Sequence, residues 1–278
     1  GSSQPVTRTV LGTDGSTVTW QTNDQIGIGY YSAPGNKSLP FKTSSTGSNV
    51  IFWGQAADQQ NPYFMMYPYQ ENARISYKTN LQAEYKFSFP KNQTATAGSF
   101  DPKANISVGV IPKRYEPFIA YNVGGLVRFT IKGTDKVKQV KLFAIGQDNL
   151  VGDITSTISF KTNGQINKMQ TKITNGTPVV NLVAENGGLK EETPYYIALP
   201  EEKISKGISI IFTLDDGKSI IKKVKQEINI ERAKVYDLGE IVLNPTSAKA
   251  FILKNKVLID AVSKTIHGLE RYDNGDMN

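Results

Sequence analysis

The sequence predicts an all-β protein made of two tandem β-sandwich domains followed by a C-terminal extension. Three observations support this fold class. Apolar and polar residues alternate with period two between clusters of turn residues, which is the pattern of half-buried strands. The turn clusters recur about every 8–12 residues, a spacing typical of sandwiches and barrels. Almost no helical repeat interrupts the pattern before the last thirty or so residues.

The first half of the chain contains six short segments with strand character. Ile26, Ile28 and Tyr30 share one side of the clearest alternating run, and Tyr67 ends an apolar run before Pro68. We expect Trp20 to be buried in the core of the first sandwich, because large aromatic residues at strand positions usually fill cores. The expected strands cover 18–20, 25–31, 50–53, 63–67, 84–89 and 106–110.

The second half alternates more regularly. Phe129 lies on an alternating face with Val127 and Ile131, and we expect it to be buried in the second sandwich. The residues Asp215-Asp216-Gly217 separate two apolar runs and predict a tight hairpin, because Asp and Gly tolerate the positive φ of such turns. The expected strands cover 125–132, 137–145, 154–161, 177–183, 195–199, 208–214, 219–230 and 234–243.

Breaks in this alternation predict the domain organisation. Pro117 interrupts the pattern, which restarts just afterwards, and it changes again after Pro245. We therefore expect domains at 1–118 and 119–245 and an extension at 246–278. Within the extension, residues with near-helical spacing favour a helix over 255–269, whereas an alternating set also fits a strand. The first set is Phe251, Leu258, Val262, Ile266 and Leu269, and the second is Phe251, Leu253, Val257 and Ile259.

Composition excludes several classes of function. The 278 residues contain no cysteine, so disulfides, thiolate metal sites and a cysteine nucleophile are ruled out. The net charge is +7, but the basic residues are dispersed, and their densest group, at 218–225, is not interleaved with arginine or aromatic residues. We therefore expect no nucleic acid partner. No apolar run approaches the roughly 20 residues of a membrane-spanning helix.

The sequence also lacks a recognisable catalytic or metal-binding constellation. The single histidine, His267, has no serine or carboxylate pattern near it, and the run 273–276 lacks the spacing and final glutamate of an EF-hand. Adjacent acids at 191–192, 201–202 and 215–216 stand in turn contexts and are not expected to converge on one substrate. We predict that the protein is not an enzyme and needs no cofactor or metal. A carbohydrate-active enzyme using two distant carboxylates stays open as an alternative.

A second alternative is a surface lipoprotein that binds glycans. Trp20, Trp53 and the aromatic residues of 63–69 could form a platform for stacking sugars. The competing interpretation, which we favour, is that these residues fill the core.

Short motifs also follow one another along the chain in a definite order. They are Thr7-Arg8-Thr9, then Trp20 with Asp24 and Ile26, Tyr67-Pro68-Tyr69, Phe100-Asp101 with Ala104 and Ile106, the run 122–129, the run 137–142 followed by 150–153, the run 195–200, the Asp-Gly hairpin and the run 233–243. Taken together over residues 7–243, they resemble the fimbrillin (type V pilin) subunits of Bacteroidales surface fibres.

The resemblance implies a function and a location. It implies two transthyretin-like sandwiches, exported as a lipoprotein and displayed at the cell surface on the outer membrane or in a fimbria, with membrane contact only through a lipid anchor outside this chain. The expected partners are other pilin subunits of the fibre, and receptors or glycans on host or bacterial surfaces.

The resemblance further implies assembly by strand addition. In that family an arginine-directed protease removes an N-terminal strand, and a strand from another subunit fills the groove. Arg8 is the candidate processing site here, and Phe251, Leu253, Val257 and Ile259 are the candidate anchors of a donor strand. Residues 246–278 extend past the usual last strand, so a donor strand, a cap and a further module all stay open.

Overall fold

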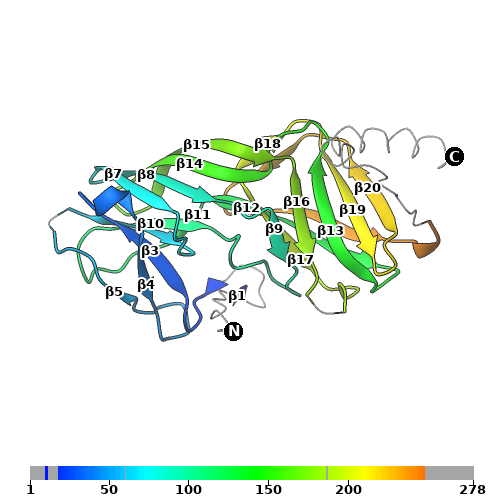
Figure 1. Cartoon of the computed structure of the whole chain (residues 1–278), viewed down its shortest axis with the longest axis horizontal. Coiled ribbons are helices and arrows are strands. Elements are labelled where there is room, and N and C mark those ends of the chain that lie inside the picture. Colours follow the sequence, from blue (N-terminus) through cyan, green and yellow to red (C-terminus); the bar gives the residue numbers. More distant parts are fainter. Residues whose placement is uncertain (1–9, 12–17, 60, 186, 248–278) are drawn as a thin grey trace.

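The fold was analysed in a computed structural model, which describes residues 10–11, 18–59, 61–185 and 187–247. The described chain is all-β, with two short 3-10 turns, η1 (Pro34–Asn36) and η2 (Pro245–Ser247). This confirms the predicted fold class. The molecule is elongated, with the strands of residues 25–54 at one end and those of residues 208–224 at the other (Figure 1).

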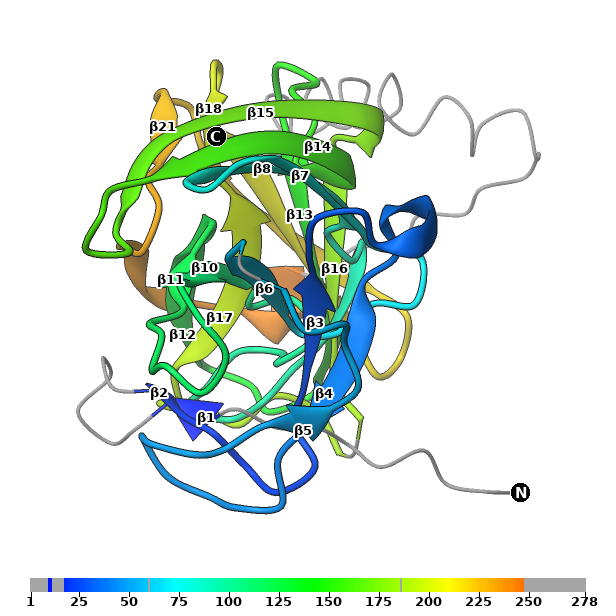
Figure 2. The ribbon, with the colours of Figure 1, turned by 90° about the vertical axis from the view of Figure 1, so that its left-hand side faces the viewer.

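The first part of the molecule contains two sheets that face each other. The six-stranded sheet has the order β11 (Tyr121–Asn122), β10 (Ser107–Ile111), β6 (Tyr63–Tyr67), β3 (Gln25–Gly29), β4 (Leu39–Lys42) and β5 (Trp53–Gly54). The four-stranded sheet has the order β15 (Ile166–Thr177), β14 (Val151–Phe160), β8 (Gln82–Ser88) and β7 (Arg74–Thr79). Figure 2 shows the second sheet arching over the first. Phe64 of β6 meets Phe160 of β14 between them, with ring centroids 6.0 Å apart.

Two further sheets form the second sandwich. A three-stranded sheet has the order β17 (Tyr195–Pro200), β12 (Gly124–Lys132) and β22 (Val235–Val242), and a five-stranded sheet has the order β20 (Ser219–Val224), β19 (Ile208–Leu214), β13 (Val137–Ala144), β16 (Val179–Val183) and β9 (Asn92–Thr94). Phe129 of β12 packs edge-on against Phe212 of β19, with centroids 6.0 Å apart. Two small sheets pair β1 (Val10–Leu11) with β2 (Val18–Thr19) and β18 (Glu202–Ile204) with β21 (Ile228–Ile230).

Strand pairing crosses the predicted domain boundary at residue 118. β8 pairs with β14 over seven residue pairs, from Asp153↔Ser88 to Ser159↔Gln82. The short β9 pairs in parallel with β16. The main apolar cluster likewise contains residues from both sides of this boundary, from Phe64 to Leu243. The division into 1–118 and 119–245 stays a prediction, and any separation of these halves would have to break the β8–β14 ladder.

The six-stranded sheet has apolar residues on both faces. Phe64 and Met66 belong to the main core, whereas Tyr63, Met65 and Tyr67 belong to a second cluster on the other face. All five residues of β6 are buried, so the strand shows no alternation in exposure. Half-buried side chains from Trp20, Phe52, Ala56 and Phe118 cover that second face.

The expectation for Phe129 is confirmed, whereas that for Trp20 is met only in part. Phe129 is 1% exposed. Trp20 is only half-buried and lies on the outer face of the six-stranded sheet, in edge-on contact with Phe52 and Tyr67 at 5.0 Å each. The alternation around Trp20 shows that its side chain packs on a sheet, but it does not show which face has a second sheet against it.

Most of the predicted strands are confirmed, but two of them differ in extent, and the structure adds β1, β4, β7, β9, β11, β15 and β18, which were not predicted. The expected strand 50–53 is reduced to the two residues of β5, and the expected strand 219–230 is two strands, β20 and β21, in different sheets. β15 was not predicted because its twelve residues are mostly exposed and polar. The Asp215–Gly217 turn does join β19 and β20, and the Gly217 amide donates to the Leu214 carbonyl.

Candidate interaction edges

The residues proposed from sequence for processing and strand donation lie outside the described part of the chain. These are Arg8, Phe251, Leu253, Val257 and Ile259, and His267 and the acidic run 273–276 are outside it too. Their roles stay predictions. Among the described residues, the strands at the edges of the sheets are the first candidate sites.

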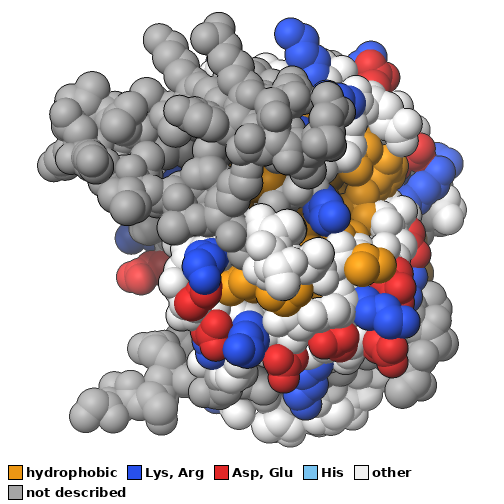
Figure 3. Space-filling model, turned by 90° about the vertical axis from the view of Figure 1, so that its right-hand side faces the viewer, with side chains coloured by type: hydrophobic (Ala, Val, Ile, Leu, Met, Phe, Trp, Pro, Cys, Tyr) orange, Lys and Arg blue, Asp and Glu red, His pale blue; other side chains and the backbone are white. Residues whose placement is uncertain are grey.

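β22 forms a long edge with exposed apolar side chains. Among the described strands it pairs only with β12, in parallel, and an ion pair between Arg128 and Asp237 joins the two. Val235 is 45% exposed and Val242 58% exposed at its two ends. Apolar side chains lie between charged ones on this end of the molecule (Figure 3). The other exposed residues of the strand are Asp237, Gly239 and Glu240, so the edge is apolar only at its two ends, where it invites pairing with another chain.

A small pocket lies at the beginning of β22. Its volume is about 120 Å³, and its lining residues are Leu126, Asn229, Ile230, Glu231, Lys234, Val235 and Tyr236. This is well below the roughly 300–1,000 Å³ of a small-molecule site. The pocket is large enough for a single side chain, which is the kind of recess that a strand added at an edge uses for its alternate residues.

β5 forms a second apolar edge, in the other part of the molecule (Figure 1). Ile51 is 64% exposed and Trp53 is 65% exposed, while Phe52 between them turns inward against Trp20. Gly54 pairs with Phe41 of β4, and any side chain at position 54 would overlap the Phe41 ring. The glycine therefore lets β5 lie close against β4, which leaves Ile51 and Trp53 as the outermost apolar groups of this edge.

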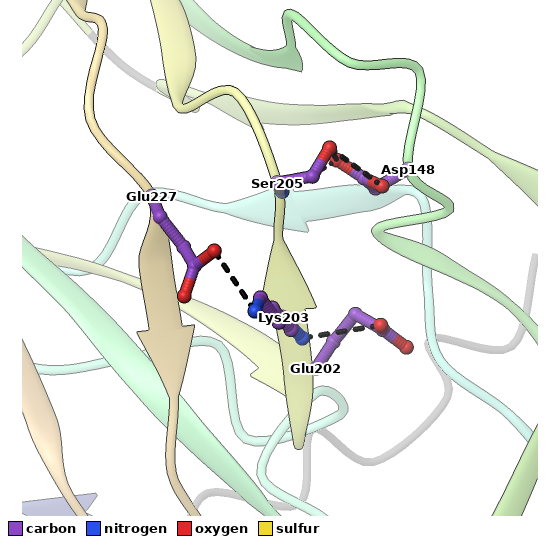
Figure 4. A network of polar contacts seen from close by, with 5 residues as sticks. All are labelled: Asp148, Glu202, Lys203, Ser205 and Glu227. Carbon is purple, nitrogen blue, oxygen red and sulfur yellow. Dashed lines mark hydrogen bonds and ion pairs between the residues drawn. The ribbon is translucent and has the colours of Figure 1, made fainter.

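A group of polar side chains around β18 contains two carboxylates that could in principle act as a pair (Figure 4). Asp148 accepts hydrogen bonds from the Ser205 amide at 2.8 Å and from its hydroxyl at 2.9 Å. Lys203 forms an ion pair with Glu227 at 2.9 Å, and its amide donates to Glu202. Each carboxylate thus has a local partner, and the Glu202 and Asp148 carboxylates lie apart from each other in Figure 4. The arrangement supports a turn and offers no shared position for a substrate.

Burial raises the pKa of the Glu202 carboxyl, and the nearby Asp148 charge raises it further. A raised pKa in the folded state means that this group favours folding below its ordinary value of 4.5 and loses that contribution as pH rises through the folded-state pKa. We expect Glu202→Gln to be more stable than the wild type at pH 7, and the difference to disappear near pH 4. Urea unfolding at both pH values measures this. Glu201→Gln, on the exposed neighbour, is the control, and a Glu202→Gln variant that is no more stable than the wild type at pH 7 would contradict the argument.

The structure does not bring the proposed sugar platform together. Tyr63 and Tyr67 are 6% and 1% exposed and belong to the second apolar cluster, as the core interpretation predicted. Trp20 is half-buried, and only Trp53 is well exposed. Within the described ranges, no three acidic or histidine side chains gather in a way that could hold a metal ion.

No protein-family model matches the sequence, and no curated protein matches it. Solved structures with some similarity include a candidate cell adhesion protein from Bacteroides uniformis, with 17% identity, a TM-score of 0.49, and coverage of 83% of this chain and 90% of that one. A candidate cell adhesion protein from Bacteroides ovatus has 13% identity, a TM-score of 0.45, and coverage of 85% and 90%.

A fimbrial protein from Bacteroides ovatus is also similar, with 12% identity, a TM-score of 0.35, and coverage of 82% of this chain and 47% of that chain. All three TM-scores are below 0.5, and all three identities are below 20%. At that level the comparisons assign neither a family nor a function to this chain. The fimbrillin resemblance therefore stays a prediction from the sequence motifs.

Proposed function

We propose that this protein is a structural subunit of a surface fimbria or a cell-adhesion protein, assembled by strand addition between subunits. The observation that carries the proposal is the placement of its edges. The β5 edge, with exposed Ile51 and Trp53, lies at one end of the elongated molecule, and the described chain runs out through β22 to Ser247 at the other end (Figure 1).

This placement suits a fibre for geometric reasons. A contact between two different patches on identical subunits is heterologous, and it builds an open filament when the rotation between subunits does not close a ring. Patches at opposite ends of an elongated subunit meet that condition without steric conflict. A strand added to an edge supplies main-chain hydrogen bonds along its length, so the contact can be strong although it is narrow.

The donor in this proposal is the segment 250–260 and the acceptor is the β5 edge of a neighbouring subunit. Phe251, Leu253, Val257 and Ile259 would supply alternate anchors, and Arg8 would be the site at which processing opens the acceptor. Such a subunit would be displayed at the cell surface through a lipid anchor, with other pilin subunits as its first partners and receptors or glycans as further partners. Within the described residues, no helix is long and apolar enough to cross a membrane.

Deletion of residues 246–278 tests this proposal. We expect the protein processed after Arg8 to form concentration-dependent oligomers, and the deletion to reduce their association at least tenfold in analytical ultracentrifugation. Trp53→Lys should weaken association similarly, because a charge on the outermost strand opposes edge pairing.

The matched control is Leu81→Lys, which lies in the turn between β7 and β8, is 36% exposed and is outside the six-stranded sheet. It should leave association unchanged. Because main-chain hydrogen bonds and apolar pockets are little screened, association should persist in 1 M salt, where the Debye length is only about 3 Å. Unchanged oligomerisation after the deletion would rule out the donor-strand proposal.

A further inference from the structure

The outward face of the five-stranded sheet has an apolar centre. On β13 the residues Val140, Leu142 and Ala144 point into the main core, so Phe143 between them points outward. Register places Phe143 beside Val179 of β16 and Ser209 of β19. Phe143 and Ile211 form a separate apolar cluster with the half-buried Val179 and Ile221.

This outward face is much less exposed than its position in a two-layer sandwich predicts. Outward faces of antiparallel sheets are normally solvated. Here Phe143 is 1% exposed, Ser209 0% and Ile211 9%. The hydroxyl of Ser209 is buried and has no hydrogen-bond partner. Water is therefore excluded from the centre of this face.

The environment of Lys141, which lies on the same face, agrees with this exclusion. Its register partners are Asn181 on β16 and Ile211 on β19. Burial lowers the pKa of the Lys141 ammonium, and the charge of nearby Lys91 lowers it further. An ammonium group on a freely hydrated sheet face would not be desolvated in this way.

The described part of the chain does not account for this burial. Every described residue of the Phe143 cluster comes from the sheet itself, from β13, β16, β19 and β20. The described layers lie on the inward side of the sheet, where Phe129 meets Phe212. The group that buries Phe143 and Ile211 is therefore not the second layer of the sandwich.

We propose that residues 248–278 of the same chain dock on this outward face and cover Phe143 and Ile211. The segment is long enough to reach Phe143. The Leu243 amide donates to the Lys132 carbonyl, which places the chain close to the beginning of β13. Phe143 lies six residues along that strand from Val137, or about 20 Å. The 31 residues after Ser247 cover about 45 Å even at the rise of a helix.

The sequence of the segment also fits this face. Leu258, Val262, Ile266 and Leu269 recur every three or four residues and supply one apolar side for contact with the Phe143 cluster. The inference is independent of strand donation. Where the segment also serves as donor, it must leave this face when subunits assemble.

Thiol labelling gives a direct test because the chain has no cysteine of its own. Ile211→Cys places one thiol on the covered face, and Lys86→Cys places one on the exposed outward face of the four-stranded sheet. In the full chain we expect the thiol at 211 to react at least tenfold more slowly than the thiol at 86. Deleting 248–278 should accelerate labelling at 211 at least tenfold and leave labelling at 86 unchanged.

A second variant distinguishes loss of the covering segment from misfolding of the shortened chain. Leu258→Lys combined with Val262→Lys in the full chain should also expose the thiol at 211. Labelling at 211 that is unaffected by both changes would overturn the proposal. Protection that weakens on dilution would also overturn it, because the cover would then come from a second copy. Oligomerisation is measured separately, so failure of strand donation and failure of this cover are distinguishable.

Discussion

Phe129→Ala is expected to lower the free energy of unfolding by about 3–5 kcal/mol, as for other large buried aromatic residues. Phe129 is 1% exposed and lies in the centre of the second sandwich. Its ring is 6.0 Å from that of Phe212 on the facing sheet and 6.2 Å from that of Tyr195, its neighbour on the paired strand β17. A cavity at this position cannot be filled by movement of one neighbour, because both rings are held by their own strands.

Urea or guanidinium unfolding at pH 7 measures this loss. Thr130→Ala is the matched control, because it truncates the next residue of the same strand, whose half-buried side chain only makes a 3.4 Å hydrogen bond to the Gly239 carbonyl. We expect the control to cost about 1 kcal/mol or less. Equal losses for the two variants would contradict the position assigned to Phe129.

Gly207→Ala should be destabilising for two separate reasons. Gly207 has a φ of +79°, a conformation that side-chain-bearing residues rarely adopt. A Cβ at this position would also overlap the backbone carbonyl oxygen of Val224, and it would lie 2.7 Å from that of Gln226. Backbone atoms of a paired strand cannot rotate away, so β19 and β20 would have to separate locally. We expect a loss of about 3 kcal/mol or more, from left-handed strain and overpacking together.

Gly217→Ala isolates the conformational part of this effect. Gly217 has a φ of +81°, nearly the same as Gly207, but nothing lies within 4 Å of a Cβ placed there. It should cost only about 1–2 kcal/mol. Chemical unfolding of both variants gives the difference, which measures the steric clash alone. If the two losses are the same, the close approach of Val224 is not as the structure describes it.

The strands that the sequence predicted have either one buried face, as in β12, or a continuous apolar run, as in β6. β12 shows the ideal case, since Val127, Phe129 and Ile131 are buried and the residues between them are not. Two arrangements weaken the alternation signal. β6 is buried on both faces, and β15 has mostly polar side chains at the edge of a sheet. Pairing partners such as β8 and β14 are not encoded in any local pattern, because every alternating strand offers the same kind of edge.

The candidate sites were harder to predict for similar reasons. Residues 50–53 are expected to form a strand, but nothing in their pattern shows that the side chains of Ile51 and Trp53 are exposed at the edge of the sheet. A signal for the covered face was present. At residues 142–145 the chain reads Leu-Phe-Ala-Ile, a loss of alternation that indicates apolar contacts on both sides of β13.

The β8–β14 ladder has a mechanical consequence for a protein held at both ends. β14 and β15 run along the long axis of the molecule, and β14 joins β8 from the first half of the chain (Figure 1). Antiparallel hydrogen bonds are perpendicular to their strands, so tension along this axis loads the seven pairs in shear, all together, instead of opening them one by one. Rupture under force depends on the unfolding rate, and shared loading slows it. The β8–β14 ladder therefore resists stretching along the long axis, the direction in which the proposed fibre would be pulled.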